Sequence, residues 1–275
     1  MHLFEFNHDL ISNYMLVGVL ASSMMTVAWV VHLKYKNASI ADIPWCFGNI
    51  IFFAAMLKLN DTCSTAHFVM LAMITLWSAR LGIYLTRRIF QDPYNEDGRF
   101  KKIRADLKSH EGMWFFFMFQ FQAALQIVLC TGYLLCAMDS NLQMGLWQYL
   151  ALGLFLVSFA MQWLADSQLA RFAKENKGKN NVCDTGLWKY SRHPNYFFEF
   201  CIWLSFAIFA INSPNGAFAF ISPALIYFVL TQLSGVKLSE EVSLAKRGDI
   251  YRDYMNRTSS FFLLPPKNSK TKSET

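Results

Sequence analysis

The chain has 275 residues, of which 54% are hydrophobic and 16% are charged, and its formal net charge is +6. Soluble domains carry about 25% charged residues, so this composition excludes an ordinary soluble globular protein and indicates a membrane protein. The positive charge requires no nucleic-acid partner, because membrane topology and attraction to anionic lipid head groups account for it. The six cysteines and six histidines show no metal-ligand spacing, so we expect no metal site and small, buried thiols.

The N-terminal residues 1–13 contain Glu5 and Asp9 but no lysine or arginine. A cleaved signal peptide begins with a positively charged region, so the first apolar run is predicted to be a retained transmembrane helix. Crossing about 30 Å of hydrocarbon takes roughly 20 residues, and backbone amides cannot stay unpaired in lipid, so such runs must be helices. The predicted spans cover roughly residues 11–33, 40–58, 64–86, 112–136, 143–171, 196–212 and 216–236.

Lysines and arginines are concentrated in alternate connections between these runs. The first, third and fifth connections and the C-terminal segment hold nearly all of them, so the positive-inside rule places the N-terminus outside and the C-terminus in the cytosol. The predicted fold is an all-α, multi-pass membrane protein with seven transmembrane helices, in a bacterial inner membrane or the endoplasmic reticulum. We expect one membrane domain over residues 1–264 and a disordered cytosolic tail over residues 265–275.

Asp42 opens the second predicted span on its cytosolic side, in the segment 40–45. An aspartate at this place can cap the helix, with Pro44 in the first turn, which is ordinary helix chemistry. A carboxylate at a membrane helix end can equally serve a functional site. The two roles are compatible, and both stay open from the sequence.

Four large or charged side chains follow one another in the third predicted span at spacings of three, four and three residues: Trp77, Arg80, Tyr84 and Arg87. This spacing places them on one stripe of a helix. Taken alone, Arg80 can snorkel to the interface and Tyr84 can belong to an aromatic belt. A stripe that combines all four instead favours a polar functional surface.

Gln162 and Asp166 lie four residues apart near the cytosolic end of the fifth span and are predicted to face the same way. A carboxylate inside a membrane marks a functional site by default. The alternative is a helix-end charge that pairs with Arg171 or Lys174.

The segment from Gly186 to Glu199 carries Arg192 and His193 at the mouth of the sixth span. Beyond Pro194, one helix face is predicted to hold Asn195, Glu199 and Trp203, which repeat every four residues. The start of this helix is expected to offer free amides and a positive dipole end to a phosphate or carboxylate. All these groups fall near cytosolic helix ends, so we expect one polar cavity that opens to the cytosol.

The run Gly-Leu-Trp-x-Tyr-Ser-Arg-His-Pro-Asn-Tyr-Phe-x-Glu resembles the C-terminal signature of the steroid 5-alpha-reductase superfamily. It is most similar to a microbial branch of uncharacterised-domain proteins, and isoprenylcysteine carboxyl methyltransferases share a related Arg-His-Pro-x-Tyr element that binds S-adenosylmethionine. The resemblance covers about residues 40–265, with the signature in the half 143–264. Its further marks are Glu96-Asp97-x-Arg99, Asp166-x-Gln168, Ser234-Gly235, Tyr251-x-x-Tyr254 and Pro265.

This resemblance implies a seven-helix bundle that binds NADPH from the cytosolic side. It assigns Asp42, which precedes Ile43-Pro44, and Tyr84, which lies three residues before Arg87, to the carbonyl of the substrate. The implied substrate pocket contains Trp45, Trp77 and Arg80. The implied cofactor-binding residues are Arg99, Asp166, Arg171, Tyr190, Arg192, His193, Asn195, Tyr196 and Glu199.

Two features depart from the family pattern. Phe198 replaces a glycine within the signature, a bulk expected to narrow a cofactor or lipid channel. The late histidine of the steroid enzymes has no match near residues 239–241, so steroid specificity does not carry over.

The expected function is NADPH-dependent reduction of a lipid-like enone such as a steroid, sterol or isoprenoid. The expected partners are this lipid-soluble substrate and membrane lipids, and the oligomeric state is not predicted. Two alternatives stay open: a membrane methyltransferase that uses S-adenosylmethionine, and a non-catalytic lipid-binding or transport protein.

Overall fold

A computed structural model describes residues 8–107, 110–233 and 235–267 of the chain. These residues form helices and connecting segments without a β-strand, as the all-α prediction requires. Of the expected tail, residues 268–275 lie outside the described part. Six helical segments are long and apolar enough to cross a membrane, judged on the described residues: Leu10–Tyr35, Ala38–Leu59, Thr65–Gln91, Glu111–Ala137, Leu146–Glu175 and Gly216–Arg247, the last of which includes the undescribed residue 234.

The sixth predicted span, 196–212, corresponds to α7 (Pro194–Phe209), which has 16 residues. A helix of that length falls short of the roughly 20 residues that a full crossing takes. The described structure therefore has six candidate membrane-spanning helices and one shorter apolar helix. The all-α prediction is confirmed and the six apolar helices support a multi-pass membrane protein, while the count of seven spans and the orientation of the termini stay predictions.

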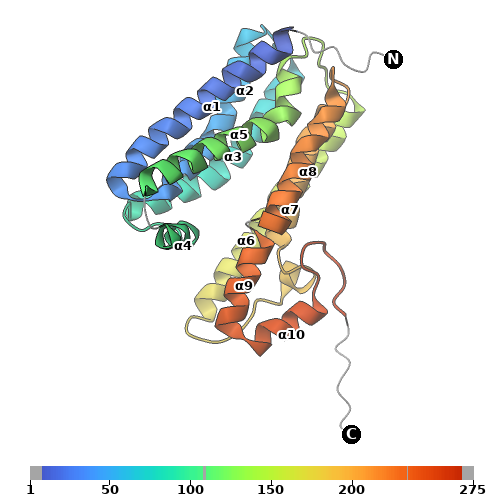
Figure 1. Ribbon diagram of the computed structural model, residues 1–275. Coiled ribbons are helices and arrows are strands. Elements are labelled where there is room, and N and C mark those ends of the chain that lie inside the picture. The colour runs from blue at the N-terminus through green and yellow to red at the C-terminus, as the bar shows by residue number, and fades with distance from the viewer. Residues whose placement is uncertain (1–7, 108–109, 234, 268–275) are drawn as a thin grey trace. The chain divides into compact units, whose positions relative to one another are not determined.

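The chain divides into two compact units, and unit 1 comprises Met1–Tyr149 and Ala207–Ser222. Its helical elements are α1 (His8–Tyr35), the 3-10 turn η1 (Ala38–Ala41), α2 (Asp42–Leu59), α3 (Thr65–Gln91), α4 (Gly98–Asp106), α5 (Glu111–Ala137) and η3 (Gly216–Phe220). Figure 1 shows α1, α2, α3 and α5 packed alongside one another, with the short α4 near one end of this bundle. In a bilayer such helices associate through close van der Waals packing and through hydrogen bonds between helices.

A buried polar cluster lies within this apolar packing and joins α2 to α5. The hydroxyl of Tyr133 donates to Oδ1 of Asn49 at 2.5 Å, and the Asn49 amide donates to the Trp45 carbonyl at 2.6 Å. The Gln126 amide donates to the same carbonyl at 2.9 Å. Buried polar groups are costly unless they find partners, so these bonds fix the register of α2 against α5.

Unit 2 comprises Leu150–Phe206 and Pro223–Thr275. Its elements are most of α6 (Leu146–Glu175), η2 (Gly186–Lys189), most of α7, most of α8 (Ile221–Phe228), the π-helical turn η4 (Val229–Leu233), α9 (Val236–Arg247) and α10 (Asp249–Arg257). Gly248 has φ of +56°, a conformation that glycine adopts without strain, and it turns the chain sharply from α9 into α10. Figure 1 shows α10 at the end of α9, where its buried residues are Tyr251 and Tyr254.

Candidate functional site

Five side chains of α6 and α7 form a polar cluster, which we call the α6–α7 cluster: Gln162, Asp166, Asn195, Glu199 and Trp203. The Asn195 amide donates to Oδ1 of Asp166 at 3.1 Å. The carboxylate of Glu199 accepts from the Gln162 amide at 2.7 Å and from the Trp203 indole at 2.9 Å. The faces expected from the four-residue spacing on each helix therefore meet, and each helix supplies partners to the other.

The α6–α7 cluster also contains an acceptor that its neighbours leave unused. Gln162 is buried, and its Oε1 has no hydrogen-bond partner among the described residues. Buried side-chain oxygens nearly always have a partner, so an unused one beside a carboxylate suits a ligand that brings N–H or O–H donors. Arg171, one of the two basic residues weighed as alternative partners of Asp166, is exposed and pairs with Glu175 at 3.5 Å.

Arg192 has its donors directed into the protein. Its Nε lies 2.7 Å from Oε1 of Glu240, and its Nη1 donates to the carbonyls of Met255, at 2.8 Å, and of Thr258. The side chain is only 8% exposed. A buried guanidinium with a carboxylate and carbonyl acceptors is well satisfied, so Arg192 ties α9 and the end of α10 to the signature segment.

His193 shares the same carboxylate. Its Nε2 lies 3.3 Å from Oε1 of Glu240, and its ring stacks on Tyr196 with centroids 5.3 Å apart and planes 4° apart. The carbonyl of His193 accepts from the amides of Tyr196 and Phe197. These two amides at the start of α7 are therefore already bonded within the chain, and the binding of an anion there stays a prediction.

The C-terminal segment 258–267, which we call the strap, runs along the signature segment. The Ser191 hydroxyl donates to the Phe261 carbonyl at 2.8 Å, and the Leu264 amide donates to the Tyr190 carbonyl at 3.0 Å. Just before the strap, the Tyr254 hydroxyl donates to the Trp188 carbonyl at 2.5 Å. Burial raises the pKa of Tyr254, which keeps this hydroxyl a donor at any ordinary pH.

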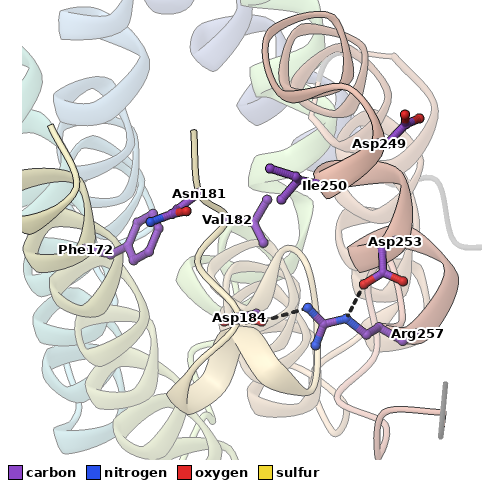
Figure 2. A pocket seen from close by; sticks show the side chains of 8 residues that line it. All are labelled: Phe172, Asn181, Val182, Asp184, Asp249, Ile250, Asp253 and Arg257. Carbon is purple, nitrogen blue, oxygen red and sulfur yellow. Dashed lines mark hydrogen bonds and ion pairs between the residues drawn. The ribbon is translucent and has the colours of Figure 1, made fainter. Parts of the chain in front are cut away.

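A separate open pocket of about 650 Å³ lies between α6, the following loop and α10 (Figure 2). Its central ion pairs join Arg257 to Asp184 at 2.7 Å and to Asp253 at 3.2 Å. The hydrogen bond to Asp184 is the largest cause that raises the pKa of Arg257. The excess of carboxylates makes this pocket unsuited to a phosphate. It is lined by Phe172, Asn181, Val182, Asp184, Asp249, Ile250, Asp253 and Arg257, none of which the sequence singled out for a site.

In unit 1, Asp42 is the first residue of α2 and not its cap. The cap position is Ala41, which makes no side-chain capping bond. Nη2 of Arg88 lies 3.9 Å from Oδ2 of Asp42, while its Nη1 lies 3.4 Å from Oδ2 of Asp97. Arg88, which the sequence reading passed over in favour of Arg87, is thus the cation shared by two carboxylates.

Tyr84 lies one turn before Arg88 on α3 and is 64% exposed. Among the described residues its hydroxyl has no hydrogen-bond partner, so no bond joins it to Asp42 in unit 1. The predicted stripe is present at helical spacing, but it runs from a buried Trp77 through a half-buried Arg80 to exposed Tyr84 and Arg87.

The remaining predicted residues differ in their exposure. Trp45 is half-buried, and Tyr190 is 41% exposed. Arg99 lies in α4, and its side chain is outside the described part of the structure. The expected single cavity draws on residues of both units and stays a prediction.

Comparison with known proteins agrees with the extent of the resemblance. A family model described as "Protein of unknown function (DUF1295)" matches residues 28–258. The chain is 26% identical over 276 residues to Uncharacterized protein C594.04c of Schizosaccharomyces pombe, an alignment that covers 91% of this chain and 80% of the yeast protein. No solved structure matches the chain.

Proposed function

Because the chain belongs to the family described as "Protein of unknown function (DUF1295)", which is associated with steroid 5-alpha-reductase-like proteins, we propose that it is a membrane-embedded NADPH-dependent reductase. Its proposed substrate is a lipid-like enone, such as a steroid, sterol or isoprenoid. The exposed apolar surface of the helices suits a substrate that arrives through the lipid. The proposal further includes seven transmembrane helices, an outside N-terminus and a cytosolic C-terminus.

The seventh span is supported by the hydrogen bonds of the strap. Tyr190 and Ser191, which precede α7, are bonded to Leu264 and Phe261, which follow α10. The two ends of the intervening chain therefore lie on the same side of a membrane. If the segment Gly216–Arg247 crosses the bilayer, α7 must cross it too, in the opposite direction.

The observation that carries the cofactor proposal is the unused buried oxygen of Gln162 beside the carboxylate of Glu199. Two neighbouring acceptors fit the NH₂ of a carboxamide, which is the polar group of a nicotinamide ring. Asp166 and Asn195 would bind ribose hydroxyls, and His193 and Tyr196 would flank the same end of α7. When bound, NADPH supplies a hydride, which is chemistry that no side chain can provide.

Arg192 has a different role from the one that its charge suggests. Its donors are directed to Glu240 and to two carbonyls, so we assign it to holding the strap in place. The exposed Arg171 is left as a cation that can approach a phosphate.

Reduction of an enone moves negative charge onto the carbonyl oxygen, which therefore needs a donor. We assign this role to the exposed hydroxyl of Tyr84, with Asp42 as the carboxylate that supports it. The guanidinium of Arg88 lies 3.9 Å from the carboxylate of Asp42, and its charge would help to orient this carboxylate.

The proposal is tested with Tyr84→Phe in native membranes, with NADPH oxidation followed across a panel of lipid enones. Loss of one such donor lowers the rate about 100- to 1000-fold. Thermal stabilisation of the purified variant by NADPH should be kept, because Tyr84 lies outside the residues assigned to the cofactor. Unchanged turnover would contradict the assignment.

Thermal stabilisation also separates the alternatives. Stabilisation by S-adenosylmethionine and not by NADPH would indicate a methyltransferase. Stabilisation by neither, with stabilisation by a lipid, would indicate a binding or transport protein.

A further inference from the structure

Glu96 is a buried carboxylate in the loop between α3 and α4, and its side chain is 4% exposed. Its Oε1 accepts from the Ala38 amide at 2.7 Å and from Nη2 of Arg104 at 2.7 Å. Its Oε2 accepts from Nε of Arg104 at 2.9 Å. Two parallel bonds to a guanidinium are the strongest pairing that a carboxylate forms in proteins, so this buried charge is well compensated.

Two further hydrogen bonds join the same loop to the start of η1. The Asn37 amide donates to the Pro93 carbonyl at 3.0 Å, and the Asp97 backbone amide donates to the Ser39 hydroxyl at 3.1 Å. Together with the bond from Ala38 to Glu96, they attach residues 93–97 to residues 37–39. We call this set of contacts the η1 latch.

Arg104 secures the latch from its other side. Its Nη2 donates to the Lys36 carbonyl at 3.1 Å, its Nη1 pairs with Glu111, and its guanidinium lies 4.5 Å from the centroid of the Phe115 ring. Stacking and hydrogen bonding together restrict an arginine to one orientation. The latch is therefore rigid on both sides of the Glu96 carboxylate.

The latch reaches Asp42 by two routes. The backbone amide of Asp42 donates to the carbonyls of Ile40 and Ser39, so the end of η1 fixes where α2 begins. The carboxylate of Asp42 faces Arg88, which also pairs with Asp97, the residue next to Glu96. Residues 96 and 97 are thus linked to the backbone of Asp42 through η1 and to its carboxylate through the nearby guanidinium of Arg88.

We infer that Glu96 is a positioning residue, which holds Asp42 in place through Ala38 and η1. The inference rests on the proposed function, in which Asp42 supports the donor at the substrate carbonyl. Glu96 need not touch substrate or cofactor to act in this way. A shift of about 1 Å at a reacting group can cost about 100-fold in rate, so a carboxylate remote from the chemistry can control kcat.

The test compares Glu96→Gln with Glu111→Gln in the full-length protein in lipid nanodiscs. Both variants remove a carboxylate from Arg104, but only Glu96 contacts η1. Hydrogen exchange of residues 38–42 should accelerate about tenfold or more in Glu96→Gln and stay unchanged in Glu111→Gln. Turnover of a lipid enone should show a kcat about 100-fold lower in Glu96→Gln, with the KM for NADPH unchanged within about twofold.

Ser39→Ala provides a milder second variant in case Glu96→Gln does not fold. It removes only the acceptor of the Asp97 amide. Faster exchange of residues 38–42 and a kcat about three- to tenfold lower are expected, because one neutral hydrogen bond contributes about 1 kcal/mol.

Unchanged hydrogen exchange of residues 38–42 in both Glu96→Gln and Ser39→Ala would overturn the role given to the η1 latch. If Glu96→Gln shows faster exchange of residues 38–42 but a normal kcat, the positioning role is overturned. The proposed function still stands in that case, provided that the wild-type protein reduces a lipid enone and Tyr84→Phe abolishes this activity. A wild-type protein that reduces no lipid enone would overturn both.

Discussion

The α6–α7 cluster and the η1 latch both hold carboxylates near the ends of membrane helices, but they do so with different partners. In the α6–α7 cluster, Glu199 is bonded by Gln162 and Trp203, which lie on two long helices. In the η1 latch, Glu96 is bonded by the Ala38 amide and by Arg104, which lie outside the long helices. In the α6–α7 cluster the helical repeat determines which side chains face each other. In the η1 latch the contacts depend on the backbone conformation of two connecting segments, residues 37–39 and 93–97.

This difference has an energetic consequence. A pair of packed helices keeps its geometry through many contacts. The loss of one polar contact between them is therefore expected to lower the stability of the protein without moving the helix backbones much. A connection is fixed by few bonds, so the loss of one bond moves the backbone that follows it. We therefore expect variants in unit 2 to lower stability most, and variants around Asp42 to lower turnover most.

The largest stability effect is expected for Arg192→Met. The change leaves Glu240 and two backbone carbonyls without their buried cation, which costs about 3–5 kcal/mol. Thermal unfolding in detergent, followed by tryptophan fluorescence, measures the loss. Arg171→Met is the matched control and should change the free energy of unfolding by less than about 0.5 kcal/mol, because Arg171 is exposed. Equal effects of the two changes would contradict the structural role of Arg192.

A smaller stability effect is expected for Glu199→Gln. A glutamine offers one oxygen where the carboxylate offered two, so either the Gln162 amide or the Trp203 indole loses its acceptor, at about 1–3 kcal/mol. Thermal stabilisation by NADPH should also fall, because the proposed carboxamide site loses an acceptor. Glu175→Gln, at an exposed ion pair on the same helix as Gln162, is the control. Full stabilisation by NADPH in Glu199→Gln would remove Glu199 from the cofactor site.

The sequence predicted the helices and the shared faces well, because both follow from local periodicity. The spacing of Gln162 and Asp166, and that of Asn195 and Glu199, correctly identified the surfaces through which α6 and α7 meet. The same reasoning did not find Glu240, which approaches Arg192 from a helix 48 residues later in the chain. No periodicity relates residues so far apart.

The same limit applies to the backbone near helix ends. Capping of α2 was one of two roles left open for Asp42, and the structure places Asp42 one residue after the cap position, because η1 runs directly into α2. Amides of α7 were expected to be free, and the His193 carbonyl takes those of Tyr196 and Phe197. Both outcomes depend on the backbone just before the helix, which residue type alone does not determine.

Arg88→Gln and Arg87→Gln form a pair that tests the region around Asp42. Arg88 lies near both Asp42 and Asp97, whereas Arg87 is exposed. A half-exposed ion pair contributes at most about 1 kcal/mol, so both variants should fold with nearly normal stability. Turnover should nevertheless fall about tenfold or more in Arg88→Gln only, since a guanidinium 3.9 Å from the Asp42 carboxylate is lost. A larger loss of turnover in Arg87→Gln than in Arg88→Gln would contradict this expectation and favour Arg87, the arginine that the family pattern selects.

The last prediction concerns membrane topology and is tested by cysteine labelling. The cysteine substitutions that it uses are expected to leave stability unchanged. Cys63 is exposed in the connection between α2 and α3, and the other five cysteines are buried. Burial raises the pKa of Cys183 to about 11, so at pH 8 it stays a slowly reacting thiol. A membrane-impermeant maleimide should therefore label Cys63 on intact cells.

In a Cys63→Ser background, Lys101→Cys beside the latch, Lys177→Cys after α6 and Lys267→Cys in the strap should label only after permeabilisation. Two crossings separate Lys101 from Lys177, and α7 with the segment Gly216–Arg247 separates Lys177 from Lys267. Labelling of Lys177→Cys and Lys267→Cys from opposite sides would mean that α7 does not cross, in conflict with the bonds between the strap and the signature segment. Labelling of all three from inside would instead put the η1 latch and the α6–α7 cluster on the side where a soluble nucleotide is available, as a cytosolic cofactor requires.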